Sequence, residues 1–346
     1  MKHTVFVSGV SGYLASWIVA CLLRDGHTVQ GTVRCLDDAA KLRHLHNLAR
    51  IHPGRLELFE ADLSEAGSFD KAMQGCSVVI HTASPRFPAR PGNVQDALLQ
   101  PALEGMLNVL GSVKRTPTVR RVVLTSSIGT LYTDARELTG VPDCMVREDG
   151  CNTNRDPRYD SHVYAKMVAE RAARKAQRQQ RHWDLVTMHP GVMFGPALSR
   201  RTDTASVRIM LRFLRGMFRI GVPQLTLGFV DVRDAAEAHV RAALLPHAGG
   251  RYIVVGEALR MLEMAKLMRV KAFGLKDRRP RREMSRLAAS FLAPLYGLQR
   301  KYVLRNAGHL VRYDNVRSRN ELGLVYRSPA ETLHDHISQL VADDLL

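Results

Sequence analysis

The chain has 346 residues, 45% of them hydrophobic, which is enough to bury a large core in one domain or in a domain with a smaller lobe. No apolar stretch is long enough to span a bilayer and no secretory signal is recognisable, so we expect a cytoplasmic protein. The five cysteines form no CxxC pair, and no pair of histidines is accompanied by further residues at the spacing of metal ligands. We therefore expect reduced thiols and no metal site.

The formal net charge of +17 comes largely from one segment near the C-terminus. Between residues 269 and 305, eleven Lys and Arg residues accompany only two acidic residues, Asp277 and Glu283. Such a segment suits nucleic acid, an anionic membrane or an acidic substrate, but it lacks a nucleic-acid-binding motif. We expect no nucleic-acid partner. Residues 276–305 should form a solvated surface that packs on the body or covers a pocket, with peripheral membrane contact as the alternative.

An apolar strand near the start of the chain turns through glycines into an amphipathic helix. Gly9 permits the tight turn, Gly12 lets the backbone approach a ligand, and Ala15 allows close helix–strand packing. The unpaired N–H groups at this helix N-terminus predict a pyrophosphate site. Two further residues of this turn belong to the predicted site, Tyr13 and Leu14.

Strand-like and helix-like segments alternate through the first half of the chain. Strands are expected at 29–33, 56–59, 78–81, 122–124 and 185–188, and helices at 39–50, 94–114 and 161–180. This alternation predicts an α/β fold with a doubly wound parallel sheet and helices on both faces.

The pattern becomes less regular after residue 190. Residues 229–231 and the helix at 232–245 should return to the main sheet, and the remainder, including 251–255, should form a smaller, interleaved α/β lobe. The predicted cofactor-binding domain is therefore 1–190 together with 225–245. The predicted substrate lobe is 191–224 together with 246–346.

The end of the second predicted strand indicates which cofactor binds. NAD-specific sites usually place an acidic residue there, whereas this chain has Arg34. A guanidinium pairs well with a ribose phosphate, which favours NADP, and Lys41 could add a second positive charge. The alternative is that Arg34 only lines the surface. Asp62, after the third strand, is placed to accept from the adenine amino group.

Several segments together resemble the extended short-chain dehydrogenases/reductases, and most of all the dihydroflavonol and cinnamoyl-CoA reductases. The resemblance covers nearly the whole chain, and its specificity lies in the order and spacing of the segments. These are residues 7–17, 31–34, 61–63, 79–85, 104–108, 124–127, 166–170, 189–191 and 229–232.

The resemblance implies a Rossmann fold that binds NADP, with the nicotinamide over the sheet and a small organic molecule as substrate. It implies that Ser127 hydrogen-bonds the substrate carbonyl and that Lys166 holds the nicotinamide ribose. It also implies that the cofactor ribose is bordered by Thr82, Ala83 and Ser84 and that the carboxamide is contacted by Pro190, Gly191 and Val192. Two more residues, Leu63 and Thr125, are implied along the rest of the cofactor.

The sequence departs from this family at the general acid. The family has a tyrosine four residues before the lysine, one helical turn away, where the ammonium lowers the phenol's pKa. Here that position is His162. Tyr164 should point to a different side of the helix, and Tyr159 is two turns from Lys166.

His162 leaves several functions open. Near neutral pH it should be mostly uncharged beside Lys166, hence a better base than acid. We expect an NADP-dependent oxidoreductase in which His162 replaces the tyrosine. The alternatives are a catalytically impaired NADP-binding protein, or a redox-neutral isomerase or lyase with bound NADP. We expect a monomer or homodimer, and Glu170 and Arg171 should form a solvated or packing pair.

Overall fold

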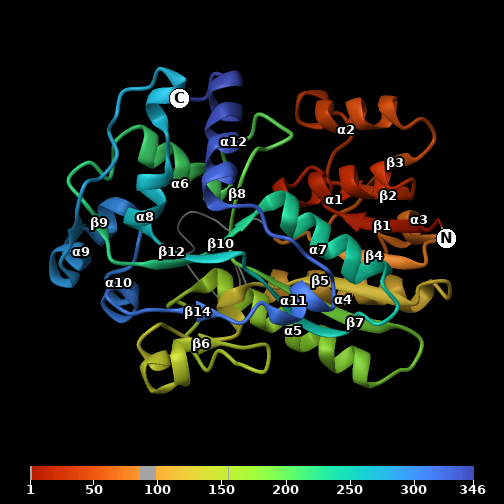
Figure 1. Cartoon of the computed structure of the whole chain (residues 1–346). Helices are drawn as coiled ribbons and strands as arrows, with labels where there is room; N and C mark the ends of the chain where they lie inside the picture. Colours follow the sequence, from red (N-terminus) through yellow and green to blue (C-terminus); the bar gives the residue numbers. More distant parts are fainter. Residues whose placement is uncertain (1, 86–98, 155) are drawn as a thin grey trace.

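The central feature of the fold is a seven-stranded sheet in which every strand runs parallel to its neighbours (Figure 1). The computed structural model describes residues 2–85, 99–154 and 156–346. The strand order is β11-β7-β5-β4-β1-β2-β3. These strands are β1 (Thr4–Ser8), β2 (Thr28–Val33), β3 (Leu56–Glu60), β4 (Val78–His81), β5 (Arg121–Thr125), β7 (Asp184–Pro190) and β11 (Gly250–Val254).

Helices cover both faces of this sheet (Figure 1). Strand side chains alternate between the two faces: Val5 and Val7 join one apolar cluster, and Phe6 joins the other. The first cluster includes α1 (Tyr13–Arg24), α2 (Ala39–Ile51) and α7 (Val232–Leu244); the second includes α3 (Asp70–Met73), α4 (Gln100–Arg115) and α5 (Ser161–Arg178). The predicted doubly wound α/β fold is confirmed.

A second lobe is built around a three-stranded sheet of order β12-β10-β8. Its core includes Phe194 and Phe229, whose rings stack with centroids 4.9 Å apart. The strands are β8 (Val192–Phe194), β10 (Thr226–Asp231) and β12 (Glu257–Arg260), with the short pairs β9 (Val222–Pro223) with β13 (Glu283–Met284) and β6 (Met145–Val146) with β14 (Arg312–Tyr313). The remaining helices are α6 (Ala205–Leu214), α8 (Met261–Leu267), α9 (Arg286–Leu292), α10 (Arg300–Asn306), α11 (Val316–Asn320) and α12 (Pro329–Ala342).

Two strands lie in a different sheet from the one predicted. The strand at residues 229–231 was expected in the main sheet, but β10 pairs with β8 and β12 in the second lobe. Residues 251–255 were expected in the second lobe, but β11 pairs with β7 as the edge strand of the main sheet. Both segments are short apolar runs whose sequence does not specify a pairing partner. Residues 94–98 of the helix predicted at 94–114 lie outside the described residues.

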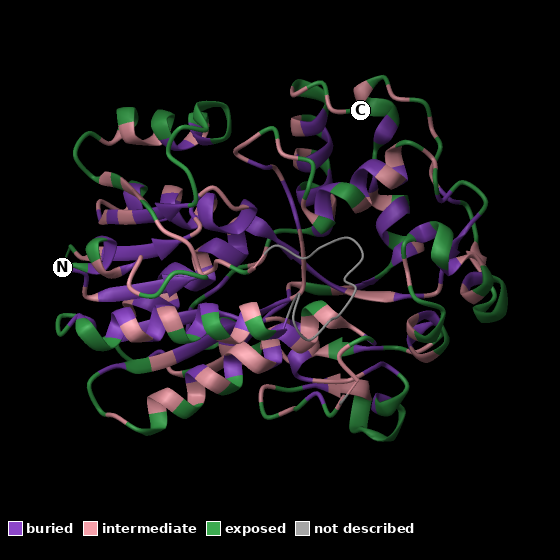
Figure 2. Ribbon diagram, turned by 180° about the vertical axis from the view of Figure 1, so that it is seen from behind, coloured by how far each residue is buried: buried purple, intermediate pink, exposed green. Residues whose placement is uncertain are grey.

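Burial follows this two-lobe arrangement (Figure 2). The strands of the main sheet are mostly buried, and the helices around them are buried on the side that faces the sheet. Across the described ranges, no helix has the length and apolar character needed to cross a bilayer.

One buried hydrogen bond ties the glycine turn to the second lobe. The hydroxyl of Tyr13, in the first turn of α1, donates to the carbonyl oxygen of Gly195, just after β8, at 2.6 Å. Both residues are buried. The bond therefore joins two segments that are far apart in sequence.

We expect Tyr13→Phe to destabilise the protein by about 1–3 kcal/mol, because it leaves a buried carbonyl without its donor. Urea unfolding measures this change. Tyr296→Phe is the matched control, since the Tyr296 ring is also buried but its hydroxyl makes no hydrogen bond within the described ranges. Equal midpoints for Tyr13→Phe and wild type would contradict the role given to this bond.

Candidate functional site

The register of the sheet aligns the carboxyl ends of β1, β4 and β5 with one another and with Thr187 inside β7. Ser8 of β1 pairs with His81 of β4, His81 pairs with Leu124 of β5, and Leu124 pairs with Thr187 of β7. Because the strands are parallel, the residues that follow leave the sheet side by side. Ligands of open α/β sheets bind at this carboxyl edge.

A hydrogen-bonded cluster fastens β1 to β4 at this edge. The Ser8 hydroxyl oxygen accepts from the backbone N–H groups of Thr82 and Ala83, both at 3.0 Å. It lies 2.8 Å from Nδ1 of His81. Burial, with the charge of Lys166, lowers the pKa of His81 to about 3, so this histidine is neutral near pH 7. The cluster fixes the predicted ribose residues without a buried charge.

The glycine turn has the geometry that its sequence predicts. Gly9 has a φ of +67°, and a Cβ there would lie 3.2 Å from the Cβ of Ala83. A Cβ on Gly12 would lie 3.0 Å from the carbonyl oxygen of Gly9. Tyr13 and Leu14 are buried at the start of α1. Glycine is therefore required at both positions by the packing of the turn against Ala83 and against its own backbone.

A second close backbone approach occurs after β7. A Cβ at Gly191 would lie only 2.2 Å from the carbonyl oxygen of Gly228 in β10, so this position accepts no side chain. A Cβ at Gly228 would in turn lie 3.0 Å from the ring of Tyr313. Pro190 ends β7 and Val192 begins β8, which places the predicted carboxamide residues where the two lobes meet.

The predicted phosphate-binding cations lie at a separate end of the site. Arg34 follows β2, and Lys41 is on the first turn of α2, 3.7 Å from the Asp38 carboxylate. Asp62 follows β3 and accepts from the backbone N–H of Ser64 at 2.8 Å. Bonds from Ser64 lower the pKa of Asp62, and the charge of Arg34 contributes.

A cleft of about 630 Å³ lies beside Lys41, between α2 and residues 198–203. Ser11 of the glycine turn lines it together with Lys41 and Arg201, and Arg201 Nη1 donates to the carbonyl oxygen of Ser11 at 2.9 Å. The cleft therefore connects the glycine turn to the start of α2.

The predicted residues at the other end of the site enclose one small cavity. Its volume is about 20 Å³, which is room for water but not for a cofactor ring. The cavity therefore shows that these residues lie close together, but it is not itself a cofactor pocket. Lys166 Nζ donates to the carbonyl oxygen of Thr125 at 3.0 Å, and burial lowers the pKa of Lys166 to about 8. The predicted residues on its wall are Leu63, Ala83, Ser84, Thr125 and Lys166.

Ser127 immediately precedes a short turn of helix over Ile128–Thr130. Neighbouring side chains hold its backbone carbonyl oxygen in place. The Ser127 carbonyl oxygen accepts from the Thr130 hydroxyl at 2.8 Å and lies 3.1 Å from Nδ1 of His189. The Ser127 hydroxyl oxygen is 3.3 Å from the N–H of Gly129. Ser127 as a whole is only partly buried.

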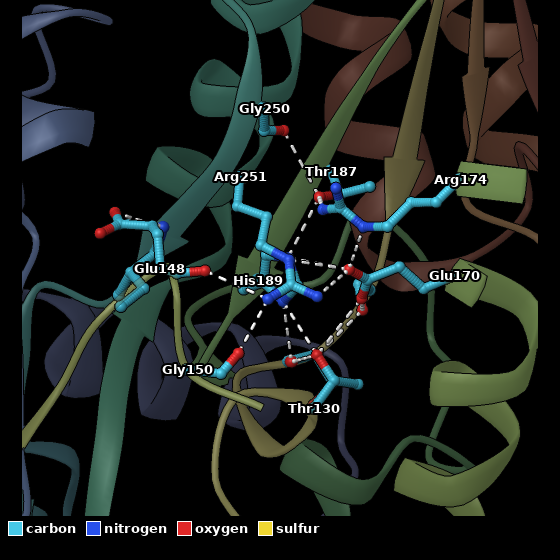
Figure 3. Close-up of polar contacts among 12 residues, drawn as sticks. Thr130, Glu148, Gly150, Glu170, Arg174, Thr187, His189, Gly250 and Arg251 are labelled. Atoms are coloured by element: carbon cyan, nitrogen blue, oxygen red, sulfur yellow. Dashed lines mark hydrogen bonds and ion pairs between the residues drawn. The ribbon is translucent and has the colours of Figure 1, made fainter. Parts of the chain in front are cut away.

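Beneath this turn, Glu170 of α5 is the centre of a buried polar network (Figure 3). Its carboxylate accepts from the Ser126 hydroxyl at 2.6 Å, from Arg174 Nε at 2.9 Å and from Arg251 Nε at 3.0 Å. Arg251 also donates to the carbonyl oxygen of Gly150 at 2.8 Å. The network thus joins α5, β11 and the segment that carries Ser127.

This network corrects the expectation that Glu170 and Arg171 form a solvated or packing pair. Glu170 is 2% exposed and is paired with Arg174 and Arg251 instead, while Arg171 is exposed. Burial opposes ionisation of Glu170, but the surrounding donors and cations outweigh it and lower its pKa to about 2. The i, i+4 spacing of Glu170 and Arg174 was a sequence signal for one partner.

His162, which the sequence resemblance aligns with a catalytic tyrosine, lies in the first turn of α5 and is exposed. Its pKa is lowered from the ordinary value by the surrounding protein atoms and then by the charge of Lys166. Solvent access moderates this shift, but its direction favours neutral imidazole near pH 7.

Neither neighbouring tyrosine takes the place of His162. Tyr159 is 5% exposed, its hydroxyl oxygen lies 3.2 Å from Nδ2 of Asn306 in α10, and burial raises its pKa to about 12. Tyr164 packs against the cluster of Leu99, Ala102 and Ala165.

Comparisons with known proteins agree with this geometry. Residues 5–256 match the model of the NAD dependent epimerase/dehydratase family. The chain belongs to this family. It is 38% identical over 272 residues to cinnamoyl-CoA reductase CAD2 of Medicago truncatula, covering 78% of this chain and 81% of that protein. It is 34% identical to tetraketide alpha-pyrone reductase 1 of Arabidopsis thaliana, covering 100% and 97%.

The fold also matches solved structures of reductases. The yeast methylglyoxal/isovaleraldehyde reductase Gre2, complexed with NADPH, has a TM-score of 0.78 and 25% identity, and the match covers 99% of both chains. The resemblance to extended short-chain dehydrogenases/reductases is thus confirmed, and this member of the family is an oxidoreductase. Among the described residues, no group of three His, Cys, Asp or Glu is placed to hold a metal ion.

We expect Glu170→Gln to destabilise this family member by about 3 kcal/mol at neutral pH, because Arg174 and Arg251 lose their buried counter-charge. The folded-state pKa of Glu170, about 2, lies below its ordinary value of 4.5. Its contribution is therefore full above pH 4.5 and is lost as the pH falls toward 2.

Urea unfolding over a pH series measures this effect, with the exposed Glu137→Gln as the matched control. The difference in free energy of unfolding between wild type and Glu170→Gln should shrink in acid. If that difference is absent at neutral pH, or grows as the pH falls, the charge of Glu170 does not stabilise the network.

Proposed function

We propose that the protein is an NADPH-dependent reductase of the extended short-chain type, which reduces a carbonyl of a small organic substrate to an alcohol with His162 in place of the usual tyrosine. The supporting observation is that Ser127 follows β5 and that Lys166 of α5 donates to the carbonyl oxygen of Thr125, at the edge that β5 shares with β4 and β1 and hence with the glycine turn. The relatives named above are all called reductases.

NADPH fits the residues along this edge. The pyrophosphate would meet the N–H groups at the start of α1, next to Gly9 and Gly12. Arg34 and Lys41 would hold the ribose phosphate, because both are cations at the end of β2 and the start of α2. Asp62 would accept from the adenine amino group.

The rest of the cofactor would extend toward β7. Thr82, Ala83 and Ser84 would border the nicotinamide ribose, with Leu63 and Thr125 next to them. Pro190, Gly191 and Val192 would contact the carboxamide at the point where β7 passes into β8. We propose that the second lobe completes the site on the substrate side.

The protein's own groups would act on the substrate oxygen. When bound, NADPH supplies the hydride that reduces the carbonyl carbon. The Ser127 hydroxyl donates a hydrogen bond to the carbonyl oxygen, and the turn above the Glu170 network holds that hydroxyl in place. Lys166 holds the ribose and favours negative charge on the oxygen. Protonated His162 delivers the proton that completes the alcohol and then takes another from solvent.

The lowered pKa of His162 gives this mechanism a distinct pH dependence. We expect kcat for reduction to rise as the pH falls from about 8 toward 6, because the protonated fraction of His162 grows as the pH nears its lowered pKa. Alcohol oxidation should show the opposite trend, since neutral His162 is the base. NADPH absorbance over an aldehyde and ketone panel measures both.

Variants of His162 test the same mechanism. His162→Ala should lower kcat by roughly 10²–10⁴-fold, the usual size of acid–base catalysis, and His162→Tyr should flatten the pH profile below neutrality. Tyr164→Phe, on the same helix but packed in the cluster with Leu99, is the control and should keep wild-type kcat. If neither the wild type nor His162→Ala oxidises NADPH and only His162→Tyr does so, the native protein is a catalytically impaired NADP-binding protein.

Cofactor preference has its own test. We expect Arg34→Ser to weaken NADPH binding roughly ten- to a hundredfold while NADH binding barely changes, because only NADPH carries the ribose phosphate. Calorimetric dissociation constants measure the ratio, and exposed Arg50→Ser on α2 is the control. An unchanged ratio would mean that Arg34 only lines the surface.

A further inference from the structure

Helix α9 and the turn that follows it carry apolar side chains on two opposite faces. The inner face places Ala289, Ala293 and Tyr296 in the core of the second lobe. The outer face carries Leu287, Phe291 and Leu295, which are 74%, 71% and 72% exposed. Only one of the two apolar faces is therefore covered by the rest of the chain.

Leu287, Phe291 and Leu295 form one apolar stripe and are not isolated exposed residues. They recur every fourth residue, the spacing that places side chains along one side of a helix. Among the described residues, they are three of the four most exposed large apolar side chains. A contiguous exposed apolar patch commonly marks an interaction surface, whereas single exposed apolar residues need no explanation.

Positive charge borders this stripe closely. The guanidinium carbon of Arg300 lies 5.6 Å from the centre of the Phe291 ring. A few residues before α9 in the chain, Arg282 Nε donates at 3.0 Å to the carbonyl oxygen of Ile220, another apolar residue, which is 61% exposed. Arg281 and Arg286 are also exposed. We call this surface the basic apolar patch: Ile220, Arg281, Arg282, Arg286, Leu287, Phe291, Leu295 and Arg300.

Little negative charge balances the patch. The sequence from residue 284 to residue 313 contains no Asp or Glu. The two acidic residues upstream already have cationic partners: Asp277 lies 2.8 Å from Arg279 and Glu283 lies 3.9 Å from Arg260. The patch therefore presents an unbalanced positive rim around an apolar stripe.

We propose that the basic apolar patch docks the protein on the surface of an anionic phospholipid bilayer. Leu287, Phe291 and Leu295 would enter the boundary between headgroups and acyl chains, and the arginines would pair with lipid phosphates. Charge complementarity selects this occupant. A symmetric contact with a second copy would set the positive rim against itself, and a nucleic-acid backbone offers nothing to the apolar stripe.

The position of the patch suits such docking. In Figure 1, α9 lies at the end of the molecule opposite the N-terminus, and in Figure 2 that end is largely exposed. The glycine turn and α2 are in the other lobe. Docking through α9 would therefore leave the predicted cofactor site accessible.

Vesicle co-sedimentation of the full chain tests the proposal, with phosphatidylcholine alone and with added phosphatidylglycerol. We expect binding only to the anionic vesicles, weaker at high salt. Leu287→Ser with Phe291→Ser should reduce the partition coefficient more than roughly tenfold, and Arg281→Glu with Arg286→Glu should do the same. Matched controls, Val325→Ser and Arg171→Glu with Arg178→Glu, should bind as wild type does.

Four results would overturn the proposal. The first is no binding to anionic vesicles, and the second is equal loss in patch and control variants, which indicates only general positive charge. The third is a dimer in solution that Phe291→Ser dissociates, and the fourth is tighter binding to nucleic acid than to vesicles. Thermal unfolding midpoints, which should match wild type since every substituted side chain is exposed, separate loss of docking from loss of fold.

Discussion

The parallel pairing of β1, β4, β5 and β7 is the constraint on which the rest of this structure depends. Residues that are far apart in sequence share one line only because Ser8, His81, Leu124 and Thr187 are register partners. A slip of one residue in any pair would turn its side chains to the opposite face of the sheet. The glycine turn, the ribose residues and Ser127 would then no longer meet.

The buried polar groups around this line reinforce it in two different ways. Near β1 and β4, His81 is neutral and its hydrogen bond with Ser8 carries no buried charge. Beneath Ser127, Glu170 is ionised and two arginines neutralise it. The second arrangement spans α5 and β11, so it couples the edge strand of the sheet to the turn that holds Ser127.

The sequence predicted the features that local physics determines. Gly9 was predicted from the turn between strand and helix, and its φ of +67° explains the residue. The alternation of strand-like and helix-like segments predicted the central strands and a helix at 161–180, where α5 lies. By contrast, the pairing of Glu170 with Arg251 depends on β11 joining the sheet, which no local pattern specifies. For the same reason, the strands at 229–231 and 251–255 were each predicted in the wrong sheet.

The account's central claim concerns where the reactive end of the cofactor lies, and a crystal structure of the NADP⁺ complex measures this directly. It predicts the adenosine phosphate against Arg34, the ribose hydroxyls within hydrogen-bond reach of Lys166, and the nicotinamide ring facing Ser127 and His162. A nucleotide bound away from the carboxyl edge of β1, β4 and β5, or a nicotinamide that turns away from Ser127 and His162, would contradict it.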